Sequence, residues 1–304
     1  MYYIVYGLLY LFSLLPLKML FLFSDFAYFL LYRVFGYRTK VVRINLKIAF
    51  PEKSPAEIKR IEKDFYLNFT DNFIESIKLI SGGVKFARKH FHYDGSLLQT
   101  QFQKGNKSQI NLGHFFNWEV GNIATTDMSS YPMLMVYLPI KNKIFERLMY
   151  KIRSSTNNPL LSAANMKNEM IPYRNELYML ALIADQVPGD LSRAYWLNFF
   201  GRPAPFLRGP ERGAVAGNLS VFFARIIKIK RGYYKFDYEL CTEDPASLPK
   251  GAITKQYADY LERAIRENPS GWLWSHRRWK SIYNPKYEKM WITDQQPGPN
   301  EPLY

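Results

Sequence analysis

The chain has 304 residues, of which 41 are lysine or arginine and 26 are aspartate or glutamate, so its formal net charge is +15. Hydrophobic residues make up 48% and aromatic residues 17%, a composition that excludes an intrinsically disordered or low-complexity chain. A single cysteine, Cys241, excludes a disulfide framework and the cysteine-rich zinc and iron–sulfur motifs. The positive charge predicts an anionic partner: nucleic acid, an anionic membrane surface, or an acidic or phosphorylated substrate.

The first 32 residues are strongly apolar. Residues 1–17 contain no charged side chain, and residues 19–32 contain only Asp25. Five basic residues follow without an acidic one: Arg33, Arg38, Lys40, Arg43 and Lys47. Basic residues beside an apolar segment are typical of the cytoplasmic side of a membrane, and they bind anionic head groups. We expect residues 1–32 to form a membrane anchor or interfacial helices, with two buried core helices as the alternative.

Several other functions are not expected. The chain has no recognisable nucleic-acid-binding motif, so nucleic acid is not an expected partner. A cleavable signal peptide is not expected either, because no basic region precedes the apolar run and no small-residue cleavage site follows it. His90 and His92 alternate along the chain but have no apparent third ligand, so we expect no metal site.

A long amphipathic helix follows the basic segment. Ser54 and Glu57 have the spacing of a capping box, with Pro55 in the first turn. Apolar residues then recur in steps of three or four from Ile58 to Ile80. Two glycines, at positions 82 and 83, are typical of a helix end. This pattern predicts a helix of about seven turns.

The remaining pattern alternates strands with helices. Three apolar runs are typical of strands covered on both faces, at residues 109–112, 133–138 and 178–184. Residues 222–240 have the alternation and central turn of a β-hairpin, and an amphipathic helix is expected near residues 257–265. The fold class is therefore α/β, with a mixed, largely buried β-sheet flanked by helices. We expect one domain over residues 33–295 and a flexible tail at 296–304.

His114 is the strongest catalytic candidate among the four histidines. It follows a predicted strand and Gly113, and it precedes Glu119 by five residues. Residues five apart lie about 140° apart around an ideal helix. The two side chains therefore meet only if His114 lies on the turn and Glu119 in the first turns of a helix beginning near Phe116. A carboxylate beside an imidazole fixes its tautomer and raises its basicity. The alternative is a histidine that caps a turn near the core.

In this setting the pair resembles the His-x4-Glu motif of the lysophospholipid acyltransferase superfamily. More narrowly, the chain is similar to the lipid A biosynthesis (lauroyl/myristoyl) acyltransferase family. The matching segments occur in the family's order, at residues 43–52, 137–143, 184–189 and 272–280. The last of these, Trp272-Leu273-Trp274-Ser275-His276-Arg277-Arg278-Trp279-Lys280, is the most specific match.

The resemblance implies roles for individual residues. His114 would be the general base, Glu119 its orienting partner, and Arg153 the group that stabilises the oxyanion. The residues expected to bind substrate are Asn142, Lys143, Asp185, Gln186 and Arg277. The implied fold is that of the glycerolphosphate acyltransferases, with an N-terminal apolar membrane-anchoring helix.

The implied reaction moves a fatty acyl chain from an acyl carrier protein thioester to a hydroxyl of a lipid A precursor. Acyl coenzyme A is the alternative donor, and no metal or other cofactor is required. The expected partners are acyl carrier protein, a phosphorylated glycolipid acceptor and membrane lipid, at the cytoplasmic face of the bacterial inner membrane. Two alternatives stay open: O- or N-acylation of another membrane lipid, such as an aminolipid or a lysophospholipid, and a non-catalytic peripheral protein that binds anionic lipid.

Overall fold

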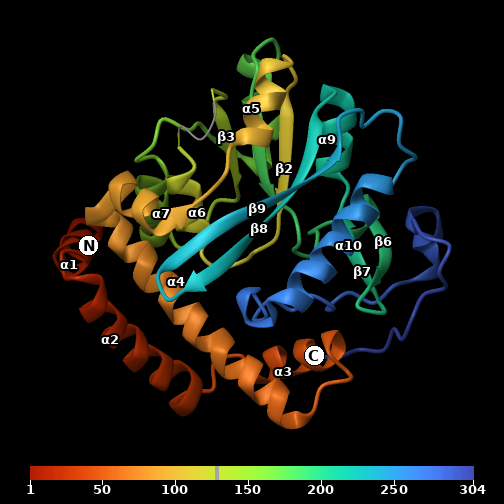
Figure 1. The fold of residues 1–304 in the computed structure, drawn as a ribbon. Helices are drawn as coiled ribbons and strands as arrows, with labels where there is room; N and C mark the ends of the chain where they lie inside the picture. The colour runs from red at the N-terminus through yellow and green to blue at the C-terminus, as the bar shows by residue number, and fades with distance from the viewer. Residues whose placement is uncertain (127–129) are drawn as a thin grey trace.

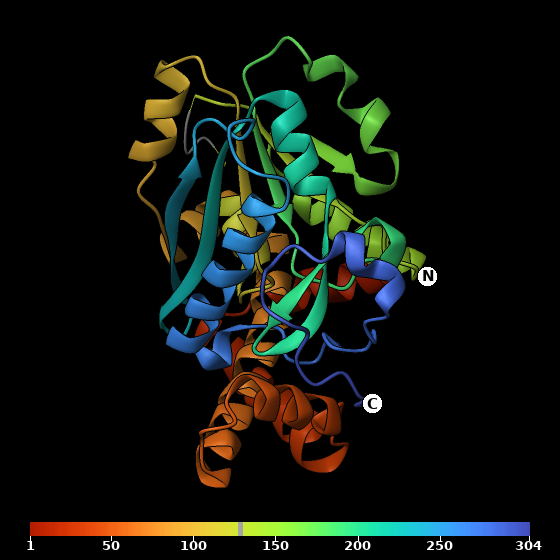
Figure 2. The same cartoon turned by 90° about the vertical axis from the view of Figure 1, so that its right-hand side faces the viewer.

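The computed structural model describes residues 1–126 and 130–304. Its centre is a seven-stranded sheet in the order β1-β9-β8-β2-β5-β3-β4, flanked by helices (Figures 1 and 2). Neighbouring strands of this sheet are parallel except for β8 and β9, which are antiparallel. The strands are β1 (Phe91–His92), β2 (Ser108–Leu112), β3 (Met133–Tyr137), β4 (Leu160–Ser162), β5 (Met179–Ile183), β8 (Ser220–Lys230) and β9 (Tyr233–Thr242). The predicted α/β fold with a mixed sheet is confirmed.

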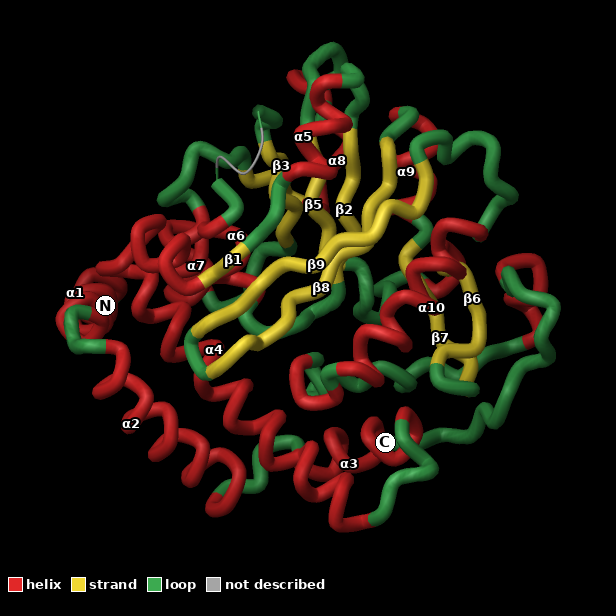
Figure 3. Tube along the Cα trace, in the orientation of Figure 1, coloured by secondary structure: helices red, strands yellow, loops and turns green. Residues whose placement is uncertain are grey.

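The middle of the sheet consists of the apolar runs that the sequence indicated. β2, β3 and β5 coincide with the strands predicted at 109–112, 133–138 and 178–184, and all of β2 is buried. β2 has a parallel neighbour on each side, β8 and β5 (Figure 3). The predicted hairpin is formed by β8 and β9, and its turn contains Gly232 at φ +79°, a conformation that glycine adopts without strain.

Helices and a small second sheet surround these strands. The helices are α1 (Tyr2–Ser13), α2 (Leu17–Tyr28), α3 (Thr39–Ala49), α4 (Pro55–His90), α5 (Ser96–Gln103), α6 (Trp118–Ala124), α7 (Lys143–Arg153), α8 (Met166–Glu169), α9 (Gly209–Gly217) and α10 (Ala252–Glu267). A π-helix, η1 (Phe29–Val34), continues α2. An antiparallel pair, β6 (Ala194–Phe199) and β7 (Arg202–Leu207), lies with α10 in front of the central strands in Figure 2.

The long helix α4 begins as the sequence predicted. Ser54 and Glu57 form the complete capping box, with the Ser54 side chain accepting from the Glu57 amide and the Glu57 side chain from the Ser54 amide. Gly83 breaks the helical geometry at φ 49° and ψ −146°, and a further helical segment then continues to His90. The two glycines therefore mark a kink rather than the end of the helical chain.

The N-terminal segment packs along α4 as a bent pair. α1 and α2 lie beside α4 at the left of Figure 1. Arg231 of the β8–β9 turn holds this arrangement, because its guanidinium contacts Asp25 of α2 at 2.6 Å and Asp71 of α4 at 2.7 Å. No single helix within residues 1–126 and 130–304 is long and apolar enough to cross a membrane. The expected anchoring helix is therefore not confirmed, although α1 and the α2–η1 segment, bent by 117°, pass that test together.

Residues 296–304, which the sequence predicts to be a flexible tail, contact other parts of the protein. They pack against the body of the protein, and Figure 1 shows the C-terminus beside α3. The Tyr304 hydroxyl donates to the Asn45 side chain of α3, Glu301 pairs with Arg202 at 2.8 Å, and the Gly298 amide donates to Asn198 at 3.0 Å. These partners lie far away in the sequence, and local composition does not reveal them. The flexibility of the tail stays a prediction.

Candidate functional site

His114 and Asp185 are brought together by two neighbouring strands. His114 follows β2 after one glycine, and Asp185 follows β5 after one alanine. The strands are parallel and in register, with Leu112 opposite Ile183, so the residues after them emerge at the same edge of the sheet. This edge, at the carboxyl ends of the strands, is where α/β sheets place their ligands.

Asp185 holds both the backbone and the ring of His114. One carboxylate oxygen, Oδ2, accepts from the His114 amide at 2.8 Å, and Oδ1 lies 2.5 Å from the ring nitrogen Nδ1. The indole nitrogen of Trp272 also donates to Oδ2, at 2.6 Å. Burial tends to raise the pKa of Asp185, but the His114 ring and these hydrogen bonds outweigh it and lower the pKa to about 2. The carboxylate is therefore ionised and fixes the ring with Nδ1 as donor.

Gly113 permits this close approach. A Cβ atom at position 113 would lie 2.8 Å from the Leu261 side chain, 2.9 Å from the Phe115 ring and 3.3 Å from Asp185. Any side chain there would push the turn away from the carboxylate. The glycine that the sequence placed before His114 is thus needed for contact with Asp185 rather than for a positive φ.

The second ring nitrogen of His114 faces Gln186. The Gln186 side-chain nitrogen lies 3.2 Å from Nε2, the nitrogen that Asp185 leaves free to accept a proton. The His114 side chain keeps 19% of its surface exposed, whereas the Asp185 side chain keeps 2%. The imidazole therefore has one nitrogen anchored on a buried carboxylate and a second nitrogen that faces only a neutral amide, on a partly exposed side chain. A general base requires a nitrogen of the second kind.

The expected contact between Glu119 and His114 is wrong. Glu119 lies in the first turn of α6 and forms a two-point ion pair with Arg153 at the end of α7: Nε donates to Oε2 at 3.0 Å and Nη2 to Oε1 at 2.5 Å. The Trp118 indole also donates to Glu119, at 3.0 Å. The helix start turns the Glu119 carboxylate toward α7, and Asp185 occupies the position beside the imidazole that was expected for it.

Arg153 is largely buried in this pair. Its side chain is 16% exposed, and Glu119 raises its pKa although burial opposes the charged form. A paired and buried guanidinium of this kind joins α6 to α7 firmly, because losing either partner would leave an uncompensated charge in the interior.

The remaining predicted residues are not in contact with His114. Asn142 caps α7, with its side-chain oxygen accepting from the Ile144 and Phe145 amides at 3.0 and 3.1 Å. Lys143 is the first residue of α7 and is exposed. Arg277 is exposed, with its guanidinium carbon 5.8 Å from the centre of the Tyr304 ring. The structure therefore joins His114, Asp185 and Gln186 in one cluster and Glu119 and Arg153 in another.

These features agree with a comparison of the whole chain with known families. Residues 1–281 match the family described as bacterial lipid A biosynthesis acyltransferase. The chain belongs to this family. It is therefore an acyltransferase of the lipid A pathway. No curated protein matches the chain.

In this member of the family, residues 272–280 contact Asp185 and the residues next to it and to His114. Trp272 holds Asp185, and residue 115, next to His114, forms an isolated β-bridge with residue 272. His276 accepts from the Val187 amide at 3.3 Å, and burial together with Arg278 lowers its pKa to about 4, so it is neutral near pH 7. The sequence marked this segment as characteristic of the family, but its contact with Asp185 became visible only in the structure.

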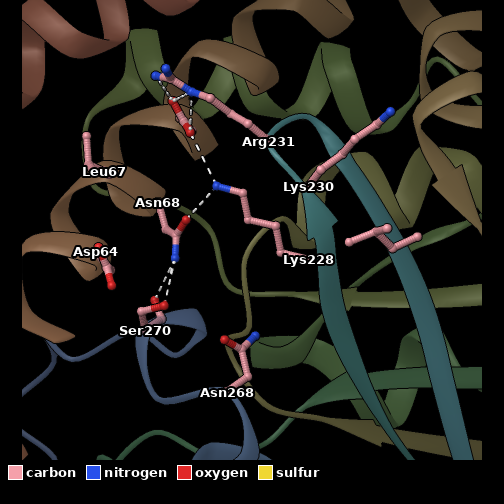
Figure 4. Close-up of a pocket in the computed structure, with 10 residues that line it drawn as sticks. Asp64, Leu67, Asn68, Lys228, Lys230, Arg231, Asn268 and Ser270 are labelled. Atoms are coloured by element: carbon pink, nitrogen blue, oxygen red, sulfur yellow. Dashed lines mark hydrogen bonds and ion pairs between the residues drawn. The ribbon is translucent and has the colours of Figure 1, made fainter. Parts of the chain in front are cut away.

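A separate polar cavity of about 400 Å³ lies between α4, the β8–β9 turn and residues 268–270 (Figure 4). None of the predicted site residues lines it. Its polar groups bind one another: Lys228 donates to Asn68 at 2.7 Å and lies 3.5 Å from Asp71, and Asn68 donates to Ser270. These contacts join α4 to β8 and to residues 268–270. The cavity is separate from the site around His114.

The N-cap residue of α6, the helix that carries Glu119, is hydrogen-bonded to a buried carboxyl group. Asn117 caps α6, and its side-chain nitrogen also donates to Glu75 of α4 at 2.5 Å; the Tyr234 hydroxyl donates to the same oxygen at 2.7 Å. Burial raises the pKa of Glu75 from 4.5 to about 7, although both hydrogen bonds lower it. Because the folded pKa lies above the unfolded one, the contribution of Glu75 to stability is complete below about pH 4.5 and is lost as the pH rises through about 7.

Substituting Glu75→Gln is therefore expected to stabilise the protein at alkaline pH. The amide retains an oxygen for Asn117 and Tyr234 and cannot ionise, so the variant should melt a few degrees above the wild type near pH 8.5 and level with it near pH 4.5. Thermal unfolding at the two pH values measures this difference. Glu176→Gln, at an exposed position, is the control and should show no pH-dependent gain. A Glu75→Gln variant less stable than the wild type at alkaline pH would contradict the assignment.

Proposed function

We propose that the protein transfers a fatty acyl chain from an acyl carrier protein thioester to a hydroxyl of a lipid A precursor, with His114 as the general base. One observation carries this proposal: the His114 ring is anchored through Nδ1 on a buried, ionised Asp185, while Nε2 faces the neutral amide of Gln186. Membership of the family supports the reaction class.

The acceptor hydroxyl takes the place of the Gln186 amide and donates to Nε2 of His114. As its oxygen attacks the thioester carbonyl, its proton passes to Nε2, and Asp185 stabilises the imidazolium that forms. The tetrahedral intermediate collapses with cleavage of the carbon–sulfur bond. The thiolate leaves and takes the proton from the imidazolium. Atoms and charge balance without a covalent enzyme intermediate.

Arg153 is the proposed source of oxyanion stabilisation. A guanidinium has five N–H donors, and two of those of Arg153 are engaged by Glu119. The pair with Glu119 fixes the guanidinium before the reaction begins, which is the condition under which a donor stabilises a developing charge effectively. Glu119 thus acts on the reaction through Arg153, and the exposed cations Lys143 and Arg277 are proposed to contact substrate phosphates.

The donor proposal rests on charge. Acyl carrier proteins are acidic, and the net charge of +15 favours association with an acidic protein. Acyl coenzyme A, which carries phosphates, would be attracted by the same charge. A direct comparison of the two thioesters distinguishes them: the proposal expects the carrier-bound chain to be transferred faster, and the difference to shrink as salt screens the charges.

We also propose that α1 and α2 lie in the cytoplasmic surface of the inner membrane. Both helices expose large apolar side chains, among them Tyr3, Ile4, Leu8, Leu11, Leu22, Phe23 and Phe26. The bent pair presents these side chains outward while its other face packs on α4. An interfacial pair of this kind places the site where a carrier protein in water and a lipid in the bilayer both reach it.

Substituting both Leu22→Glu and Phe26→Glu is expected to weaken membrane binding. These side chains are 68% and 61% exposed, so the folded protein tolerates the change, whereas each loses about 1.5–3 kcal/mol of burial in lipid. Co-sedimentation with anionic phospholipid vesicles should fall by at least about tenfold. Ile282→Glu, a residue 48% exposed, is the matched control. Equal vesicle binding by the double variant and the wild type would contradict the placement.

The function itself is tested with purified protein, acyl carrier protein thioester and a lipid A precursor. Mass spectrometry of the lipid should show a gain of one acyl chain that depends on His114. A gain confined to an aminolipid or a lysophospholipid would favour the second reaction class. Vesicle binding without transfer to any of these acceptors would indicate a non-catalytic lipid-binding protein and would overturn the proposal.

A further inference from the structure

Arg278 carries an isolated charge in the interior. The residue has no exposed surface, and its Nε, Nη1 and Nη2 atoms have no hydrogen-bond partner among the described residues. Its guanidinium carbon lies 4.3 Å from the centre of the Phe206 ring and 5.2 Å from that of Phe199. Two aromatic faces offset only part of the cost of removing a charge from water. Among the described residues, Asp185 is the carboxylate whose charge acts on this guanidinium, and it raises the Arg278 pKa against the effect of burial.

The Phe199 ring connects Arg278 to the site through Trp272 of the C-terminal segment. Phe199 lies edge-on to Trp272, with their ring centres 6.2 Å apart. The Trp272 indole donates to Oδ2 of Asp185 at 2.6 Å. The Phe199 ring beside Arg278 therefore contacts the same tryptophan that binds the Asp185 carboxylate.

The Phe206 ring connects Arg278 to the same part of the site through Tyr257 of α10. Phe206 lies edge-on to Tyr257, with their ring centres 6.3 Å apart. The Tyr257 hydroxyl donates to the Leu112 carbonyl, which also accepts from the Ala184 amide at 3.0 Å. Ala184 is adjacent to Asp185 in the chain, so Phe206 is connected through Tyr257 to the backbone next to Asp185.

We propose that Arg278 is a positioning residue for the reaction: its buried positive charge balances the Asp185 carboxylate when the His114 ring is neutral, so the pair needs no additional proton and His114 stays available as a base. The effect on catalysis rests on the proposed function. The charge acts through space, which is effective because both groups are buried away from water: Arg278 has no exposed surface and Asp185 keeps 2%. This gives the second arginine of the segment 272–280 a role that is independent of substrate contact.

The other charged and titratable groups around Asp185 are consistent with this role. They come from the turn after β2, from α10 and from the C-terminal segment: His114, Tyr257, His276 and Arg278. His276 is neutral at pH 7, as shown above. Burial lowers the pKa of Arg278 to about 10 although Asp185 raises it, so the guanidinium remains charged and is the cation that balances Asp185 when His114 is neutral.

The first test measures the coupling of the two charges through stability, without any substrate. Arg278→Met, Asp185→Asn and the double variant are compared with the full-length wild type by thermal unfolding. Arg278→Met should lower the melting temperature clearly when Asp185 is present and much less in the Asp185→Asn background. If Arg278→Met fails to fold, recovery of folding in the double variant supports the proposal equally. Additive effects, or failure of both variants, would overturn it.

The second test follows the acid limb of the pH profile of kcat/KM. Without the nearby cation the His114–Asp185 pair binds its proton more tightly, so Arg278→Met should move the acid limb upward by about one pH unit. Arg278→Lys retains the charge and should leave the limb in place. A folded, active Arg278→Met variant with the wild-type limb would overturn the proposal. If the wild type itself shows no transferase activity, the proposed function fails, while the stability comparison still decides whether the two charges are coupled.

Discussion

Asp185→Asn is expected to reduce acyl transfer by about 10³–10⁴-fold, because the variant disturbs the tautomer of the His114 imidazole, the proposed general base. In the wild type the carboxylate accepts from three donors: the His114 amide, Nδ1 of its ring and the Trp272 indole. An asparagine side chain has one oxygen, so its amide nitrogen would face one of these donors. The ring is then free to turn over and present Nδ1–H where the acceptor hydroxyl must bind. The measurement is kcat for transfer to the lipid acceptor.

Glu119→Gln is the matched comparison, because it removes the buried carboxylate that the sequence predicted beside His114. It breaks the ion pair with Arg153 and is expected to lower both stability and rate, but without disturbing the ring of His114. Its kcat should therefore fall less than that of Asp185→Asn. A Glu119→Gln variant that loses far more activity than Asp185→Asn would restore the partnership that the spacing in the sequence suggested.

His114→Asn is expected to lower kcat by about 10²–10⁴-fold, the range that a general base contributes. Asparagine keeps a polar group for Asp185, and the His114 side chain is partly exposed, so unfolding and vesicle binding should stay close to those of the wild type. His92→Asn, which changes an exposed histidine outside the site, is the control for loss of an imidazole. Full activity of His114→Asn would exclude the proposed base.

The sequence predicted the positions of His114 and Asp185 in the fold better than it predicted their contact. The apolar runs before His114 and Asp185 are strands, as expected, and both residues follow strand ends. Their contact depends on β2 and β5 being neighbours, although β3 and β4 come between them in the chain. Sheet order of this kind results from packing across the whole domain and leaves no trace in local spacing.

Glu119 shows the opposite case, a local pattern that suggested the wrong partner. Its spacing from His114 was compatible with contact, but the cap at Asn117 fixes the start of α6 and directs the carboxylate toward Arg153. Arg278 could be placed in a characteristic segment by sequence, yet its isolation follows from rings on β6 and β7. Charged residues can be counted in the sequence, whereas tertiary structure determines which residues they contact.

The most direct measurement is the state of the His114 ring by nitrogen-15 NMR of the full-length protein. The chain has only four histidines, so the His114→Asn spectrum assigns the signal. At a pH where the ring is neutral, His114 should carry its proton on Nδ1, and Asp185→Asn should shift this proton signal strongly, whereas Glu119→Gln leaves it nearly unchanged. A proton on Nε2, or a signal that responds to Glu119→Gln and not to Asp185→Asn, would contradict the account.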